Sequence, residues 1–178
     1  MNVKNKNLHS NIVLTGFMAT GKTTVGKLLA DQLGYEFVDT DQMIENRCGQ
    51  TIATIFREKG ETAFRILESE VARHLGSREH LVIATGGGMM VNPENVAELQ
   101  KKGRIYCLVA KPDVILARVS RDRDTQRPLL QTPDPMGRIR RLMAERKSVY
   151  ENFVQLDTSN HSPEDVAALL LAYYKEIV

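Results

Sequence analysis

The sequence feature that most constrains this chain is the segment GFMATGKT, which runs from Gly16 to Thr23 and matches the spacing G-x-x-x-x-G-K-[ST]. An apolar run over 11–16 precedes it, and a segment with helical spacing over 22–34 follows it. Glycines at these positions let successive backbone N–H groups turn toward phosphate oxygens, and the start of the following helix adds its positive dipole end. The segment therefore predicts a phosphate-binding loop, in which Lys22 reaches the phosphates of a nucleotide and the Thr23 hydroxyl ligates Mg²⁺.

Short apolar runs alternate with helical segments along the whole chain. The expected strands are 11–16, 35–41, 80–88, 104–110 and 154–159; the expected helices are 22–34, 42–59 with a break near Gly49, 61–76, 93–103, 112–122, 136–153 and 162–178. This alternation predicts an α/β fold with three layers, α/β/α, around a five-stranded parallel sheet. Ligands of such sheets bind beyond the carboxyl ends of the strands, where Gly16, Asp39 and Gly86 fall.

Composition and charge narrow the possible classes of protein. Of the 178 residues, 42% are hydrophobic and 26% are charged, as in ordinary globular proteins. The apolar runs are shorter than a membrane helix and the N-terminal residues are polar, so we expect a cytoplasmic protein outside the membrane. Cys48 and Cys107 make no disulfide framework, and we expect both to be reduced structural thiols.

Positive charge is concentrated between residues 118 and 147, where nine Lys and Arg residues stand against four Asp and Glu residues. Such an excess is typical of a solvated helix face, a nucleic-acid surface or a lid that covers polyphosphate. The segment contains no aromatic residue on which a base could stack, and this disfavours nucleic-acid binding.

Two carboxylates, Asp39 and Asp41, follow the second expected strand. If the chain stays extended there, both side chains point the same way and reach the phosphate site. One would then orient metal-bound water, and the other would accept a proton from an attacking hydroxyl. The alternative is that one of them only caps the next helix. The pattern N-K-x-D is absent from the sequence, which argues against a guanine-specific GTPase.

Six motifs occur in one order along the chain: GFMATGKTT, FVDTD, GETAFRILE, ATGGG, QRPLL and LMAERKSVY. With this set, the chain from about Asn11 to its C-terminus resembles shikimate kinase, within the P-loop nucleoside-monophosphate-kinase-like group. The resemblance implies Mg²⁺-dependent transfer of the γ-phosphate of ATP to the 3-hydroxyl of shikimate, in the chorismate pathway of aromatic amino acid biosynthesis. It also implies one domain over 1–178, with substrate-binding helices at about 40–76 and a mobile lid at about 120–135.

The resemblance further implies roles for individual residues. The implied nucleotide-binding residues are Gly16, Ala19, Thr20, Gly21, Lys22, Thr23, Thr24, the lid residue Arg127, and His161 in the loop beside the adenine. The implied metal-binding residues are Thr23 and Asp39. The implied substrate-binding residues are Asp41 at the reacting hydroxyl, Arg65 and Arg146 at the carboxylate, and Gly86, Gly87 and Gly88 at the ring. Asp41, as base, Lys22 and Arg127 would be catalytic.

Several alternatives remain open from the sequence. If Arg65 does not bind a substrate, it would pair on the surface with Glu68, which lies three residues away on one expected helix. The spacing of the arginines in the later helix is typical of a solvated helix face: Arg138, Arg140 and Arg141. Rival functions are a kinase for gluconate or a nucleoside monophosphate, and a regulatory module that binds a nucleotide without transfer. We expect a monomer that binds ATP and a small polyhydroxy carboxylate, but no nucleic acid.

The chain also departs from the family pattern at a few positions. Ala19 stands where the family often has Gly, and Thr23 where Ser is common. Ser120 and His161 stand where Arg is frequent. Thr23 keeps the hydroxyl that a Ser would supply. The departures at Ala19, Ser120 and His161 bear on nucleotide affinity more than on the identity of the nucleotide.

Overall fold

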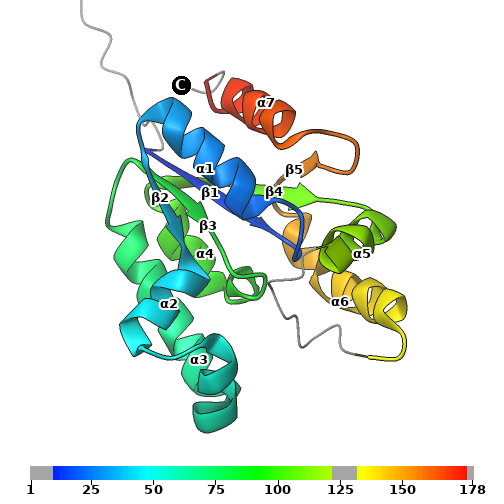
Figure 1. The fold of residues 1–178 in the computed structure, drawn as a ribbon. Coiled ribbons are helices and arrows are strands. Elements are labelled where there is room, and N and C mark those ends of the chain that lie inside the picture. The colour runs from blue at the N-terminus through cyan, green and yellow to red at the C-terminus, as the bar shows by residue number, and fades with distance from the viewer. Residues whose placement is uncertain (1–9, 122–131, 176–178) are drawn as a thin grey trace, which may run out of the picture.

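Short apolar runs form one parallel sheet in the computed structural model, which describes residues 10–121 and 132–175 (Figure 1). The strands are β1 (Asn11–Gly16), β2 (Glu36–Asp39), β3 (Leu81–Ala84), β4 (Gly103–Val109) and β5 (Val154–Asp157). The strand order is β2-β3-β1-β4-β5, and every pair is parallel. The predicted five-stranded parallel sheet is confirmed, with β1 at its centre.

Helices connect successive strands. They are α1 (Lys22–Leu33), α2 (Thr40–Cys48), α3 (Ile52–Gly76), α4 (Pro93–Gln100), α5 (Pro112–Arg121), α6 (Pro135–Tyr150) and α7 (Pro163–Lys175), with a short 3₁₀ turn η1 (Met89–Val91) before α4. Residues at the helix ends explain two of these boundaries. Gly34 ends α1 in a left-handed conformation, and the Ser162 hydroxyl accepts a hydrogen bond from the Asp165 N–H at the start of α7.

Several expected boundaries differ from the structure; the third strand, for example, was expected over 80–88, but β3 ends at Ala84. The second strand was expected over 35–41, but β2 ends at Asp39 and α2 begins at Thr40. The helix begins early because the Asp39 side chain accepts hydrogen bonds from the backbone N–H groups of Asp41 and Gln42, which caps it. The break near Gly49 is present, and Gly60 interrupts the helical conformation inside α3, close to the expected junction. The expected lid, with Arg127, lies mostly outside the described residues.

Alternating side chains on the strands form a core on each face of the sheet. Ile12 and Leu14 pack against α1 and α7, whereas Val13 faces α2, α3 and α4. On β4, Cys107 packs with residues of α5 and α6. Figure 1 shows α1 and α7 on one side of the sheet and α3, α4 and α6 on the other, so the three-layer prediction is confirmed.

Cys48 and Cys107 are both free, and Cys107 is buried. Burial raises the pKa of the Cys107 thiol to about 12, so it stays protonated.

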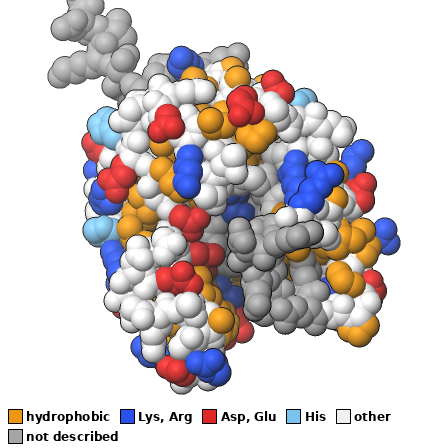
Figure 2. Space-filling model, viewed as in Figure 1, with side chains coloured by type: hydrophobic (Ala, Val, Ile, Leu, Met, Phe, Trp, Pro, Cys, Tyr) orange, Lys and Arg blue, Asp and Glu red, His pale blue; other side chains and the backbone are white. Residues whose placement is uncertain are grey.

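On the face shown in Figure 2, basic and acidic side chains are interspersed. Among the described helices, none combines the length and the apolar character needed to cross a membrane.

Candidate active site

The predicted phosphate-binding loop, Gly16–Thr23, connects the central strand β1 to α1. Gly16 has a φ of 133°, and a Cβ there would collide with the backbone carbonyl of Leu108 on β4, so only glycine fits. The Lys22 ammonium donates hydrogen bonds to the carbonyl oxygens of Gly16 (2.9 Å) and Phe17 (2.8 Å). The Thr20 hydroxyl donates to the Phe17 carbonyl as well (2.9 Å). Hydrogen bonds within the loop therefore stabilise its conformation, and they hold the Lys22 ammonium against the loop.

Arg118 of α5 ties this loop to the end of the neighbouring strands, a role that sequence reasoning missed. Its Nη1 donates to the Ala19 carbonyl (3.1 Å) and to the Thr158 hydroxyl (2.9 Å), and the Thr158 N–H donates to the Val109 carbonyl (2.8 Å). Ala19 has a left-handed φ of 58°, which is costly for a residue with a side chain. The only sequence signal was that Arg118 begins the segment rich in positive charge.

The first acid, Asp39, makes two kinds of contact, and one of them is the helix cap that the sequence left as an alternative. It caps α2, and its Oδ2 also accepts a hydrogen bond from the Thr23 hydroxyl (3.2 Å). The expected extended geometry was wrong, because Asp41 lies in the first turn of α2 rather than on a strand. An acid is favoured there by the positive end of the helix dipole. The helix therefore brings the two acids to the site.

The oxygen atoms of Thr23 and Asp39 are of the hard type that Mg²⁺ prefers, so these residues fit that ion. Residues 10–121 and 132–175 contain no group of three or more His, Cys, Asp or Glu side chains that could hold a metal. Mg²⁺ is usually held by only one or two protein ligands together with water and substrate phosphates. The pair thus suits an ion that arrives with a nucleotide.

Asp41, the second acid, is half-buried beside the loop. Its pKa is raised to about 6, first by burial and then by the negative charges of Asp39 and Glu68, while the Lys22 charge opposes the shift. A carboxylate with a pKa near neutrality is suited to taking a proton from a hydroxyl. Asp41 is therefore the described carboxylate best suited to act as a base here.

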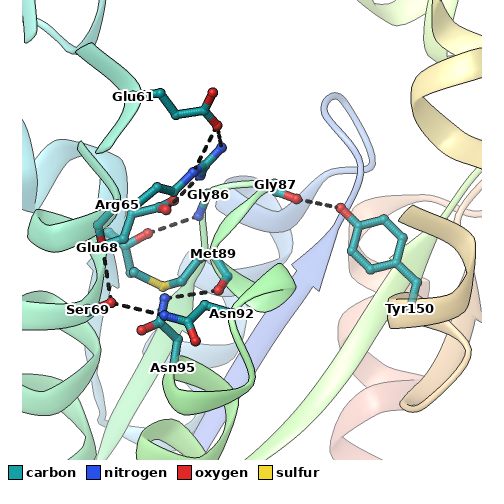
Figure 3. Close-up of polar contacts among 11 residues, drawn as sticks. Glu61, Arg65, Glu68, Ser69, Gly86, Gly87, Met89, Asn92, Asn95 and Tyr150 are labelled. Carbon is teal, nitrogen blue, oxygen red and sulfur yellow. Dashed lines mark hydrogen bonds and ion pairs between the residues drawn. The ribbon is translucent and has the colours of Figure 1, made fainter. Parts of the chain in front are cut away.

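Arg65 of α3 lies between two carboxylates, as Figure 3 shows. Its Nη1 is 2.7 Å from Glu68 Oε2, and its Nη2 is 2.8 Å from Glu61 Oε1. The Glu68 side chain is only 2% exposed, so this is not the surface pair considered as an alternative. Burial raises the pKa of Glu68, and the hydrogen bond from Arg65 opposes that rise. Glu68 thereby orients the guanidinium of Arg65, whose side chain as a whole is 40% exposed and so accessible to a ligand.

The triple glycine after β3 accommodates three polar side chains of the site. A Cβ on Gly86 would overlap the Asp41 carboxylate, a Cβ on Gly87 would be 2.6 Å from Arg146 Nη1, and one on Gly88 would be 2.6 Å from Arg65 Nη1. These side chains come from α2, α6 and α3. The structure therefore gathers Asp41, Arg65 and Arg146 around one stretch of bare backbone, close to Lys22.

Two hydroxyl groups hold this glycine segment from opposite sides. The buried Thr40 Oγ1 accepts a hydrogen bond from the Gly86 N–H (2.9 Å), and the Tyr150 hydroxyl donates one to the Gly87 carbonyl (2.8 Å; Figure 3). Sequence reasoning assigned no role to Thr40 or Tyr150 and considered Glu68 only as a surface partner of Arg65, although each lies inside one of the six motifs. The partners of Thr40 and Tyr150 lie 46 and 63 positions away along the chain, so local sequence carried no signal for these two contacts.

The remaining predicted residues are distributed as follows. Thr24 is exposed on α1, and His161 is exposed in the loop between β5 and α7. Arg127 lies outside the described residues. Arg140 and Arg141 are exposed and Arg138 is half-buried, which agrees with a largely solvated helix face.

Comparisons with known proteins point to one family. A family model described as Shikimate kinase matches residues 18–175. A shikimate kinase from Thermodesulfovibrio yellowstonii is 44% identical over 168 residues, which cover 94% of this chain and 96% of that protein. Another, from Caldanaerobacter subterraneus subsp. tengcongensis, is 45% identical over 166 residues, which cover 92% of this chain and 95% of that protein.

Solved structures agree with the sequence comparisons. A shikimate kinase from Acinetobacter baumannii in complex with shikimate superposes with a TM-score of 0.86 at 38% identity, covering 94% of this chain and 93% of that one. A gluconokinase from Sinorhizobium meliloti, at 16% identity and a TM-score of 0.61, covers 97% of this chain and 95% of that one. The latter likeness shows the shared fold alone.

Proposed function

This chain belongs to the shikimate kinase family, and from that membership we propose that it transfers the γ-phosphoryl group of ATP to the 3-hydroxyl of shikimate. The observation that supports the acceptor best is the triple glycine, against which Asp41, Arg65 and Arg146 all lie. This arrangement offers one proton acceptor and two guanidinium groups, which suits a small molecule that carries both hydroxyl and carboxylate groups.

Arg65 and Arg146 bind the substrate carboxylate in this proposal. A guanidinium donates two parallel hydrogen bonds to a carboxylate, which orients the bound molecule as well as holding it. Arg146 is half-buried and stacks 5.7 Å from the Phe17 ring centroid, so it is oriented before a ligand arrives. The bare backbone of Gly86, Gly87 and Gly88 lets the ring of the substrate come close.

The loop from Gly16 to Thr24 binds the nucleotide phosphates through its backbone N–H groups and the N-terminus of α1. Thr23 and Asp39 would hold Mg²⁺, which neutralises charge on the β- and γ-phosphates when it is bound. When the nucleotide binds, the Lys22 ammonium exchanges its hydrogen bonds to the Gly16 and Phe17 carbonyls for contacts with the γ-phosphate. Arg127 and His161 are proposed from the sequence, for the lid and the adenine side respectively.

The transfer step follows from this placement. The hydroxyl oxygen of the acceptor forms a bond to the γ-phosphorus while the bond from that phosphorus to the β–γ bridging oxygen breaks, which releases ADP. Asp41 accepts the hydroxyl proton, and Lys22 stabilises negative charge on the transferring group. Most of the acceleration would come from alignment of the two substrates, because phosphoryl transfer requires little covalent chemistry from the protein.

A coupled assay of ADP release with ATP and Mg²⁺ tests this proposal. The acceptor panel should contain shikimate, gluconate and nucleoside monophosphates, and only shikimate should raise the rate well above the acceptor-free rate. Asp41→Asn is the matched control, and chelation of Mg²⁺ by EDTA should abolish turnover. A folded protein that ignores shikimate, or that prefers another acceptor, would refute the proposal.

We also propose that the protein works as a cytoplasmic monomer without nucleic acid. The large exposed apolar side chains of the described residues are dispersed over the surface: Phe56 and Ile66 on α3, Val91, Val154, and Leu169 and Tyr173 on α7. This dispersion supports a monomer, since stable interfaces have contiguous apolar centres. Sedimentation analysis at micromolar concentration would reveal a dimer if this is wrong.

A further inference from the structure

Tyr150, the last residue of α6, reaches the triple glycine with its hydroxyl (Figure 3). Its side chain is only 6% exposed, and its ring belongs to the core cluster that includes Phe17 and Ile139. The hydroxyl donates a 2.8 Å hydrogen bond to the Gly87 carbonyl. Burial raises the pKa of Tyr150, so the hydroxyl keeps its proton and remains a donor.

The Gly87 carbonyl is held differently from its neighbours. The Gly86 carbonyl accepts from the Met89 N–H and the Gly88 carbonyl from the Val91 N–H, both at 3.1 Å within the same turn. The bond from Tyr150 instead spans 63 positions of sequence. Glycine backbone has the widest conformational freedom, so the orientation of the peptide between Gly87 and Gly88 depends on a partner outside the turn.

That peptide faces both guanidinium groups of the site. Arg146 lies one helical turn before Tyr150 on the same face of α6, and its Nη1 occupies the space beside Gly87. Arg65 Nη1 occupies the space beside Gly88. The peptide bond is planar, so turning the Gly87 carbonyl also turns the Gly88 N–H and changes the room left for both side chains.

We propose that Tyr150 is a positioning residue for the acceptor: its hydrogen bond to the Gly87 carbonyl orients the glycine backbone against which Arg146 and Arg65 lie. This inference rests on the proposed function, because it assigns those guanidinium groups to the acceptor carboxylate. Tyr150 touches the substrate-binding backbone and does not itself bind the substrate.

Tyr150→Phe tests this role, because it removes one oxygen and leaves the buried ring in place. The KM for shikimate should rise roughly 2- to 10-fold, as expected for one lost hydrogen bond, while the KM for ATP stays within about 2-fold. Amide hydrogen exchange of the segment 84–92, measured without substrates, should become faster by a similar factor. A loss of fold alone would lower the active fraction, which reduces kcat but leaves the KM for shikimate unchanged.

Tyr35→Phe is the matched control, since it removes a hydroxyl contact with Tyr174 (3.5 Å) at the opposite end of β2. It should change neither the KM for shikimate nor exchange in the segment 84–92. Unchanged exchange in Tyr150→Phe, or faster exchange with an unchanged KM for shikimate, would overturn the proposal. If the wild-type protein does not phosphorylate shikimate, the proposed function fails instead, and exchange alone then decides whether Tyr150 holds the glycines.

Discussion

The Asp41 carboxylate lies so close to Gly86 that a methyl group on that glycine would overlap its Oδ1 atom. The backbone at the end of β3 therefore defines the position of the carboxylate from one side, and the cap of α2 defines it from the other. Gly86 has no left-handed φ, so its backbone conformation does not demand glycine. The contact with Asp41 is what favours glycine at this position.

Gly86→Ala should displace the Asp41 carboxylate and lower kcat by about 100-fold, since a misplacement of about 1 Å has an effect of that size. Gly88→Ala is the matched variant, because its methyl group would meet the Arg65 guanidinium instead. It should raise the KM for shikimate and affect kcat less. Steady-state kinetics of both variants, with ATP saturating, measure this contrast; identical effects of the two substitutions would contradict it.

Asp41→Asn should increase stability at the expense of activity. The pKa of Asp41 is raised from 3.8 to about 6 in the folded protein, so its ionisation costs stability above that range. The shift corresponds to roughly 2–3 kcal/mol at pH 8. The cost is absent below about pH 4, where Asp41 is protonated in both states, and it develops as the pH rises from about 4 to 6.

Urea unfolding of wild type and Asp41→Asn without Mg²⁺ or nucleotide, at several pH values from 4 to 8, checks this. The free energy of unfolding of the variant should exceed that of wild type by an amount that grows with pH and levels off above about pH 6. A constant difference across the series would show that the ionisation of Asp41 is not the cause.

Arg65→Lys should weaken acceptor binding while leaving nucleotide binding intact. Lysine keeps a positive charge for Glu68 but loses the planar fork, so the KM for shikimate should rise about 10- to 100-fold. Glu61→Gln is the control, because the Glu61 side chain is 66% exposed and an exposed pair contributes at most about 1 kcal/mol. An unchanged KM for shikimate in Arg65→Lys would exclude a carboxylate-binding role.

Thr40→Val should lower stability, because it leaves the Gly86 N–H without its acceptor in a buried position. The expected loss is about 1–3 kcal/mol in the free energy of unfolding. Thr40→Ser keeps the hydroxyl and should recover most of that loss. Chemical denaturation of the two variants distinguishes the hydrogen bond from packing, because Val loses only the hydroxyl and Ser loses only the methyl group. A Val variant that is as stable as wild type, or a Ser variant that is no more stable than the Val variant, would contradict the prediction.

The sequence was a good guide wherever the physics is local. The segment from Gly16 to Thr23 was recognisable because spacing and flanking periodicity are properties of neighbouring residues. The sheet followed from alternation of apolar runs, and the stop of α1 from Gly34. The extended geometry expected at Asp41 failed, because capping by Asp39 began the helix at Thr40.

By itself the sequence determined the succession of strands and helices along the chain, the phosphate-binding loop, and the family through its six motifs. Only the tertiary structure decided that Glu68 is buried beneath Arg65, that Arg118 binds the Ala19 carbonyl, and that Thr40 and Tyr150 hold the glycines. The contacts of Arg118, Thr40 and Tyr150 join residues that no local pattern relates. The spacing of Arg65 and Glu68 is local, but the burial of Glu68 is not, because the burial and direction of a side chain depend on how distant helices pack on the sheet.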